Sequence, residues 1–382
     1  MSSNPSAPTA TEEWVDVPME DSKPTPKEMP EESKDDGANA KEEPPSELDL
    51  VFIVDNTGSM GQWIRSAQEN VQKIIRDIEK AEGTNVRFAL VTYRDHPPQD
   101  STYVTQTHDF TSDVSQIQGW VDDMRANGGG DFPEAVADGL YEASKLSYRP
   151  NSTKVAVLIA DAPPHGIGCH GDTFPNGCPH GHDPLEISRN MAANGITIYT
   201  VICGNFEGQA FYQGVAQITG GQYIPISSAH LLASVIVGGA QEEMSLERLM
   251  QDAQAAVHAE EEAAGRRLDD DELAARLQGM FKAKKAGALK TQFGGTDLPD
   301  FEGSAKHYSS AKTLEDVRKT KSKAHLSYGA YGGGIDTAPE MRGAMFAAAS
   351  CDEAGPSISQ CSRMVYKSRA RKSAGWWKKS SG

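Results

Sequence analysis

The sequence predicts a mixed α/β domain at residues 48–240, with a doubly wound, mostly parallel sheet and helices on both faces. Two observations lead to this fold class. Short, almost continuously apolar segments such as 50–54 and 155–160 are typical of strands that are buried on both sides. Segments with apolar residues at helical spacing alternate with them, and this alternation is typical of a parallel sheet covered by helices on both faces.

The individual elements follow from local patterns along the chain. Gly195 and Gly220 stand where the preceding helices should end, which is a common role of glycine. The segment 102–110 is expected to form an antiparallel edge strand. The other predicted strands are 49–55, 86–93, 154–161, 196–202 and 222–226. The predicted helices are 60–82, 112–126, 133–147, 184–194, 207–219 and one that begins near 229.

Three further segments differ from this domain in composition. Residues 1–47 are rich in Pro, Glu, Ser and Lys and hold almost no large apolar side chains, so we expect a disordered acidic tail. Residues 241–290 are helical in pattern and highly charged, which favours a solvated helical extension over a partner-binding helix. Residues 291–382 have weak periodicity, and we expect a low-complexity, mostly disordered, basic C-terminus.

Charge and cysteine content narrow the class of protein. The chain of 382 residues has a net charge of −17, which argues against a general nucleic-acid binder. No apolar run approaches the ~18 residues of a membrane span, and the N-terminus lacks the basic and apolar regions of a signal peptide. The five cysteines are then free thiols or metal ligands rather than a disulfide framework. We therefore expect a cytoplasmic protein without a membrane span.

A polar turn follows the first predicted strand and directly precedes the first predicted helix. Its sequence is Asp-Asn-Thr-Gly-Ser-Met at residues 55–60. It delivers a carboxylate from Asp55 and hydroxyls from Thr57 and Ser59, and oxygen ligands of this kind suit a hard divalent cation such as Mg²⁺. Ser59 has an alternative role as a helix cap.

Two other stretches supply carboxylates at the same edge of the predicted sheet. The glycine-rich turn at 128–134 carries Asp131 and Glu134, and Asp161 ends a buried strand. Because ligands bind at the carboxyl ends of strands in such sheets, we expect these side chains to meet Asp55 there. The alternative is an acidic cluster that is solvated without a metal.

Together these three stretches resemble the von Willebrand factor A domain and its metal-ion-dependent adhesion site, over about residues 48–240. The resemblance implies a Rossmann-like fold. It also implies that Asp55, Thr57, Ser59 and Asp161 hold Mg²⁺, or else Mn²⁺ or Ca²⁺. A protein partner would complete the coordination of that cation with a carboxylate of its own.

The second loop departs from the commonest version of this family. A threonine usually follows two glycines there, and this sequence has Gly130. The Asp-Phe-Pro-Glu string at 131–134 resembles the A-like domains of integrin β-subunits instead. In those domains the glutamate reaches the adhesion-site metal and the aspartate serves a neighbouring cation site. By this resemblance Glu134 is the second-loop ligand and Asp131 the alternate.

The loop at 162–183 is rich in glycine, proline, cysteine and histidine. Its candidate zinc ligands are Cys169, His170, Cys178, His180 and His182. The spacing differs from the Cys-x₂-Cys of familiar zinc fingers. A long loop of this composition nevertheless needs some stabilising link, and a bound metal could provide one. The alternative is that these histidines are polar surface residues.

We expect a non-enzymatic, metal-dependent protein-binding module, because no nucleophile elbow or metallohydrolase motif is present. The pattern also resembles A domains of intracellular fungal and protist proteins, some of which carry an alpha-kinase domain downstream. Alternatives are therefore a regulatory part of an alpha-kinase-like or other metal-dependent enzyme, and a scaffold with a purely structural metal site. The residues alone specify neither the partner nor the oligomeric state.

Overall fold

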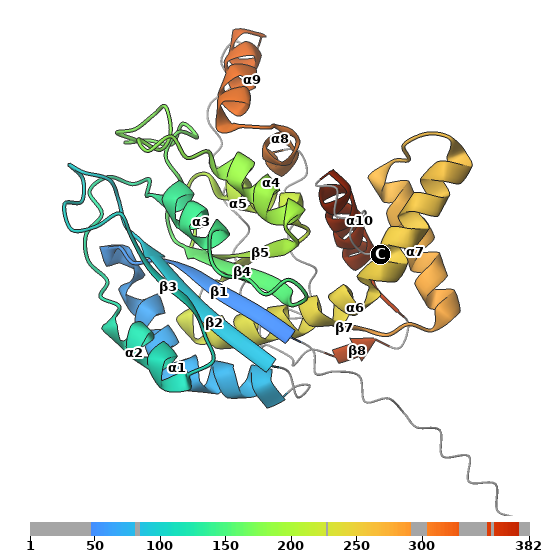
Figure 1. Ribbon diagram of the computed structural model, residues 1–382. Coiled ribbons are helices and arrows are strands. Elements are labelled where there is room, and N and C mark those ends of the chain that lie inside the picture. The colour runs from blue at the N-terminus through green and yellow to red at the C-terminus, as the bar shows by residue number, and fades with distance from the viewer. Residues whose placement is uncertain are drawn as a thin grey trace, which may run out of the picture. The chain divides into compact units, whose positions relative to one another are not determined.

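A six-stranded sheet forms the centre of the fold, in the order β3-β2-β1-β4-β5-β6 (Figure 1). The computed structural model describes residues 47–80, 85–226, 228–291, 304–327, 350–352 and 355–373. Only β3 is antiparallel to its neighbour, which confirms the predicted fold class. The strands are β1 (Glu47–Asp55), β2 (Asn85–Tyr93), β3 (Thr105–Thr111), β4 (Thr153–Ala160), β5 (Ile196–Cys203) and β6 (Tyr223–Ile226). Except for Glu47, the predicted acidic tail lies outside the described residues.

Helices cover both faces of the sheet, as Figure 1 shows. On β1, Leu50 and Phe52 pack with helices α1, α2 and α6, whereas Val51 and Ile53 pack with α3, α4 and α5. The alternation explains why the strand sequence is apolar at every position from 50 to 54. These helices are α1 (Gly61–Lys80), α2 (Val114–Asp123), α3 (Val136–Ser144), α4 (Pro184–Ala193), α5 (Gln209–Thr219) and α6 (Leu232–Ala264), with short 3-10 turns at Gly58–Met60 and Ala229–Leu231.

The central strands end at the same level. Asp55 is in register with Tyr93 of β2, and Val54 is in register with Ile159 of β4. Asp161 is the first residue after β4. The parallel register therefore carries the residues that follow β1, β2 and β4 to one edge of the sheet.

The predicted boundary at residue 240 is wrong, because α6 crosses it as one continuous helix of 33 residues. Glu242 and Glu243 were expected on a solvated extension, yet both are fully buried. Their burial is possible because Arg363 pairs with both carboxylates, at 2.6 Å to Glu242 and 2.9 Å to Glu243, and Lys367 pairs with Glu243.

The prediction that 291–382 is mostly disordered is also wrong for the described part of that segment. Helix α10 (Ile358–Ser373) buries Cys361, Met364 and Val365 among side chains of α6 and of α7 (Asp270–Lys284). The remaining elements are α8 (Ser304–Ser310), α9 (Leu314–Ser327) and a small antiparallel pair, β7 (Ala288–Lys290) with β8 (Ser350–Asp352). Residues 292–303, 328–349, 353–354 and 374–382 lie outside the described residues.

None of the described helices combines the length and the apolar character that crossing a bilayer requires.

Candidate metal centre

The turn after β1 forms a continuous chain of polar contacts with the residue after β4. Thr57 donates to Asp55 Oδ1 from its backbone N–H, at 2.9 Å, and from its hydroxyl, at 2.6 Å. The hydroxyls of Thr57 and Ser59 lie 3.2 Å apart, and Ser59 donates to Asp161 Oδ1 at 3.0 Å. The structure thus brings together the four oxygen-bearing residues that the sequence placed at the ends of the first and fourth strands.

Glu134 joins these residues from the second loop, just before α3. Its backbone N–H donates to Pro163 O at 2.9 Å, which ties the second loop to the segment after β4. A Cβ added at Gly129 would lie 2.6 Å from Glu134 Oε1 and 3.4 Å from Thr57 Cβ, so the carboxylate is next to the first turn. Asp55, Thr57, Ser59, Glu134 and Asp161 are called the Asp55 cluster below.

The electrostatics of the Asp55 cluster favour a cation. Burial and the charge of Asp161 raise the pKa of Asp55 to about 7, against the hydrogen bonds from Thr57. Burial, followed by the charge of Asp55, raises the pKa of Glu134 to about 11, and burial also raises the pKa of Asp161. Asp55 Oδ2 and Glu134 Oε2 are buried, and neither has a hydrogen-bond partner among the described residues. A divalent cation would supply the missing partner of both oxygens, so the donor set fits the metal implied by the family resemblance.

Asp131 belongs mainly to a neighbouring group. Its Oδ2 accepts two hydrogen bonds from Thr173, each 2.7 Å long. Its carboxylate also lies close to the carboxylate of Asp95 and to the ring of His165. His165 bridges Asp95, at 2.7 Å, and Asp172, at 2.8 Å. Burial lowers the pKa of His165, but the two carboxylates outweigh burial and raise it to about 9. This group therefore contains a basic side chain that its carboxylates can pair with, whereas the Asp55 cluster contains none.

The loop at 161–183 brings three of the five predicted zinc ligands together. Cys178, His180 and His182 surround Asp138 of α3, and one ligand atom from each lies within 4.8 Å of the others. These four residues are called the Asp138 cluster below. Cys169 and His170 do not join it. The Cys169 thiol is buried against Glu207 O, and the His170 backbone donates to the Glu207 carboxylate.

The sequence interpretation missed Asp95 and Asp138. Asp95 follows β2 closely, as Asp55 ends β1, so its position at a strand end was the available signal. Asp138 is a buried acid within α3 among apolar residues. An acid on the apolar face of a predicted helix is costly to bury without a partner, and that was the signal for a polar or metal site.

Comparison with known protein families agrees with this geometry. A sequence model of the von Willebrand factor type A domain matches residues 49–232. The chain contains a von Willebrand factor type A domain. The match begins in β1 and ends where α6 begins, so it spans the whole six-stranded sheet and the Asp55 cluster.

Two curated relatives share this part of the chain. An alpha-protein kinase of Dictyostelium discoideum is 32% identical over 155 residues, which are 40% of this chain and 24% of that protein. A putative ariadne-like RING finger protein of Acanthamoeba polyphaga mimivirus is 30% identical over 192 residues, which are 48% of this chain and 18% of that protein. The chain thus matches only about a quarter or less of the length of these two proteins.

Solved structures with a detectable likeness include a von Willebrand factor type A protein from Catenulispora acidiphila. It is 17% identical, with 53% of this chain and 43% of that chain covered and a TM-score of 0.38. Another is proximal thread matrix protein 1 from the mussel byssus, in a form whose metal-ion-dependent adhesion motif is occupied by zinc. It is 12% identical, with 52% of this chain and 47% of that chain covered and a TM-score of 0.36.

Proposed function

We propose that the von Willebrand factor type A domain of this chain is a metal-dependent protein-binding module. Asp55, Thr57, Ser59, Glu134 and Asp161 would hold Mg²⁺ at the carboxyl edge of the sheet. The observation that carries the proposal is the pair of buried carboxylate oxygens, Asp55 Oδ2 and Glu134 Oε2, that have no partner in the described part of the chain.

The charge balance of the Asp55 cluster supports cation binding. The charges that act on Glu134 are those of Asp55, Asp95, Asp131 and Asp161, and all of them raise its pKa. A divalent cation would relieve this repulsion, because it attracts the carboxylates of Asp55, Glu134 and Asp161 at the same time.

Mg²⁺ is proposed because every ligand of the cluster is an oxygen. Carboxylates and hydroxyls are hard ligands, and Mg²⁺ keeps open positions in its octahedron for water or a partner. When bound, the ion supplies a fixed positive charge at the surface. The residues of the chain would hold it at the edge of the sheet and leave the adjacent loop at 161–183 to contact the partner.

The first test is calorimetric titration of the full chain with Mg²⁺ and with Mn²⁺. We expect one saturable site in the parent protein and none in Asp55→Asn. Asp123→Asn is the matched control, because Asp123 is exposed on α2 and its loss removes the same charge. Failure of the parent protein to bind either cation would contradict the proposal.

The second test is affinity purification with the full chain as bait. We expect proteins that bind the parent bait in Mg²⁺ to be lost on chelation and with Asp55→Asn, and to be retained with Asp123→Asn. A bound set that is unchanged by chelation and by Asp55→Asn would show that the cation does not mediate binding.

As a second candidate function, we propose that the domain regulates an alpha-kinase. This proposal is supported by the similarity to the alpha-protein kinase of Dictyostelium discoideum, which is 32% identical over 155 residues. An intracellular location is also proposed, because no disulfide joins Cys169, Cys178, Cys203 or Cys361 in the described part of the chain. We also propose that the chain binds its protein partner without catalysing a reaction. Incubation of the full chain with labelled ATP and a generic protein substrate tests this, and phosphate transfer would overturn it.

A further inference from the structure

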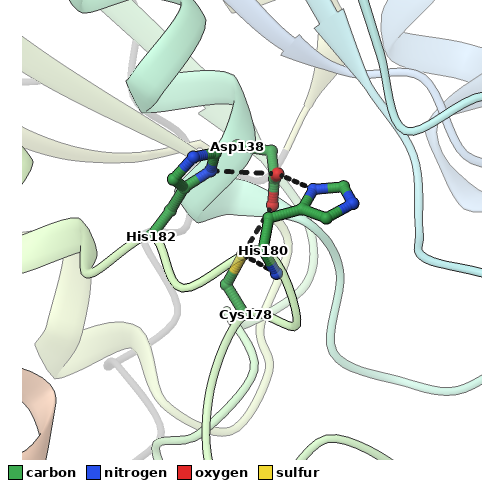
Figure 2. A group of neighbouring side chains, drawn as sticks. All are labelled: Asp138, Cys178, His180 and His182. Atoms are coloured by element: carbon green, nitrogen blue, oxygen red, sulfur yellow. Dashed lines mark hydrogen bonds and ion pairs between the residues drawn. The ribbon is translucent and has the colours of Figure 1, made fainter.

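The Asp138 cluster lies beside the Asp55 cluster but is chemically different from it. Figure 2 shows that Cys178, His180 and His182 of the loop converge on the Asp138 carboxylate of α3. His180 Nδ1 is 2.7 Å and His182 Nδ1 is 3.1 Å from Asp138 Oδ1. Cys178 Sγ is 3.1 Å from Asp138 Oδ2. One thiol and two imidazoles of the loop thus contact the same carboxylate.

The distances in the cluster are close to those around a tetrahedral zinc ion. Zinc bonds of 2.0–2.3 Å place neighbouring ligand atoms about 3.3–3.8 Å apart. The separations from Asp138 are 2.7 to 3.1 Å, and all four ligand atoms lie within 4.8 Å of one another. Shifts of less than about 1 Å therefore bring the four atoms to tetrahedral positions.

The ligand types select zinc over the hard cation of the Asp55 cluster. A thiolate and two imidazoles are soft to intermediate ligands, which Mg²⁺ and Ca²⁺ do not favour. A thiolate and a carboxylate together balance the two charges of Zn²⁺, so the occupied site is neutral. Without the cation, the Cys178 thiol donates to Asp138 Oδ2 at 3.1 Å, and a zinc ion would replace that proton.

We propose that Asp138, Cys178, His180 and His182 form a structural zinc site that fastens the loop at 161–183 to α3. Asp138 is the ligand that no loop motif contains. The loop has 23 residues between β4 and α4 and no helix or strand of its own. Ordered loops of this kind longer than about 15 residues are uncommon, and a bound metal would explain how this one is held in place. The zinc site fastens it near the C-terminal end of the loop.

Neighbouring side chains hold the proposed ligands in place. His96 Nε2 lies 3.1 Å from Asp138 Oδ2, and the His96 ring packs edge-on against His180 with ring centroids 4.9 Å apart, so this buried histidine contacts both the carboxylate and one of the proposed ligands. The His182 ring stacks on Tyr141, with ring centroids 3.7 Å apart. Orientation of ligands by such outer contacts is typical of built metal sites. The His180 side chain is 52% exposed, which gives the ion a path from solvent.

The zinc site also affects the proposed partner surface. Thr173, in the same loop, donates twice to Asp131, which lies only three residues before Glu134. A loop that is fastened at Asp138 keeps this contact in place. We therefore expect zinc removal to loosen the surface next to the Asp55 cluster without removing any ligand of that cluster.

The experiment is elemental analysis of the purified full chain after dialysis against metal-free buffer. We expect about one zinc ion per chain in the parent protein and less than about a tenth of that in Cys178→Ser and in Asp138→Asn. Cobalt substitution adds a second readout, because Co²⁺ bound to a thiolate gives a charge-transfer absorption. That band should be present in the parent protein and absent in Cys178→Ser.

Matched controls come from the two candidates that the structure places elsewhere. Cys169→Ser and His170→Ala should retain the zinc and the cobalt band, because neither side chain reaches the Asp138 cluster. Asp55→Asn should also retain the zinc, which separates this site from the proposed Mg²⁺ site. Absence of zinc from the parent protein, or its loss in Asp55→Asn or Cys169→Ser, would overturn the proposal.

Misfolding of a ligand variant is distinguished from simple ion loss by Mg²⁺ titration. If Cys178→Ser loses zinc but still binds Mg²⁺, the Asp55 cluster and the sheet are intact and the proposal is supported. His182→Ala serves as a replacement variant if Cys178→Ser does not fold. Retention of the zinc by a folded Cys178→Ser or His182→Ala would overturn the proposed ligand set.

Discussion

Replacing Asp55 by asparagine should abolish cation binding and at the same time stabilise the metal-free protein. The pKa of Asp55 rises from an ordinary value of 3.8 to about 7. Each pKa unit corresponds to about 1.4 kcal/mol, so the charged carboxylate is disfavoured in the native state by about 4 kcal/mol. An amide avoids that penalty, and its oxygen still accepts both hydrogen bonds from Thr57. The amide N–H₂ group takes the place of Oδ2, which is buried without a hydrogen-bond partner among the described residues, and this offsets part of the gain. We therefore expect a net gain of about 2 kcal/mol in the free energy of unfolding.

The sign of the pH dependence follows from where Asp55 binds its proton. In the unfolded chain the carboxyl loses its proton near 3.8, and in the native chain it keeps the proton up to about 7. The native state binds more protons between these two values, so the stability of the metal-free parent falls as the pH rises through this window. The advantage of Asp55→Asn should therefore be small near pH 4 and largest above pH 7.

Urea unfolding in the presence of a chelator measures this effect at pH values below, within and above the window. Addition of excess Mg²⁺ should stabilise the parent protein through binding to its native state and leave Asp55→Asn unchanged. Asp123→Asn controls for the loss of one negative charge at an exposed position. A free energy of unfolding for Asp55→Asn that lies below that of the parent, with chelator and above pH 7, would refute the reasoning.

Two other substitutions test the packing of α10 and of the second loop. Arg363→Ala leaves Glu242 and Glu243 buried without this partner, so the free energy of unfolding in urea should fall by about 3 to 5 kcal/mol. Gly129→Ala places a Cβ 2.6 Å from Glu134 Oε1, at a backbone φ of +80°. We expect Mg²⁺ affinity in a calorimetric titration to fall about tenfold, which corresponds to about 1.4 kcal/mol.

Each of these variants has a matched control in the same chain. Lys372→Ala removes an exposed cation from α10 and should change the stability by less than about 0.5 kcal/mol. Gly168→Ala imposes similar backbone strain, at a φ of +87°, but its Cβ meets nothing within 4 Å. Equal loss of Mg²⁺ affinity in both glycine variants would show that strain alone, and not the displacement of Glu134, is responsible.

The position of the proposed Mg²⁺ site could be predicted in part because two of its acids lie at strand ends. Asp55 and Asp161 follow apolar strands that pair in register, so the fold class alone places them at one edge. Glu134 required the family resemblance, and its closeness to Thr57 through the gap at Gly129 became visible only in three dimensions. The sequence could not choose between Glu134 and Asp131. That choice depends on Thr173, which holds the Asp131 carboxylate in a neighbouring group.

Long-range pairing explains what the sequence interpretation missed. Asp138 and His180 are separated by 42 positions, and no local pattern reports that α3 faces the loop. Helix α10 was missed for a related reason, because its buried face includes Arg363 and Lys367. Basic residues at helical spacing indicate a solvated surface, unless acids elsewhere in the chain are buried opposite them.

The docking of α10 also sets an order of events during synthesis. Glu243 leaves the ribosome about 120 residues before Arg363, which is about 6 to 24 s at 5–20 residues per second. Throughout that interval all six strands of the sheet have been synthesised, but Glu242 and Glu243 of α6 still lack Arg363. The nascent sheet domain must therefore keep that part of α6 hydrated or unformed until the last described helix arrives. Completion of the domain depends on residues that the sheet itself does not contain.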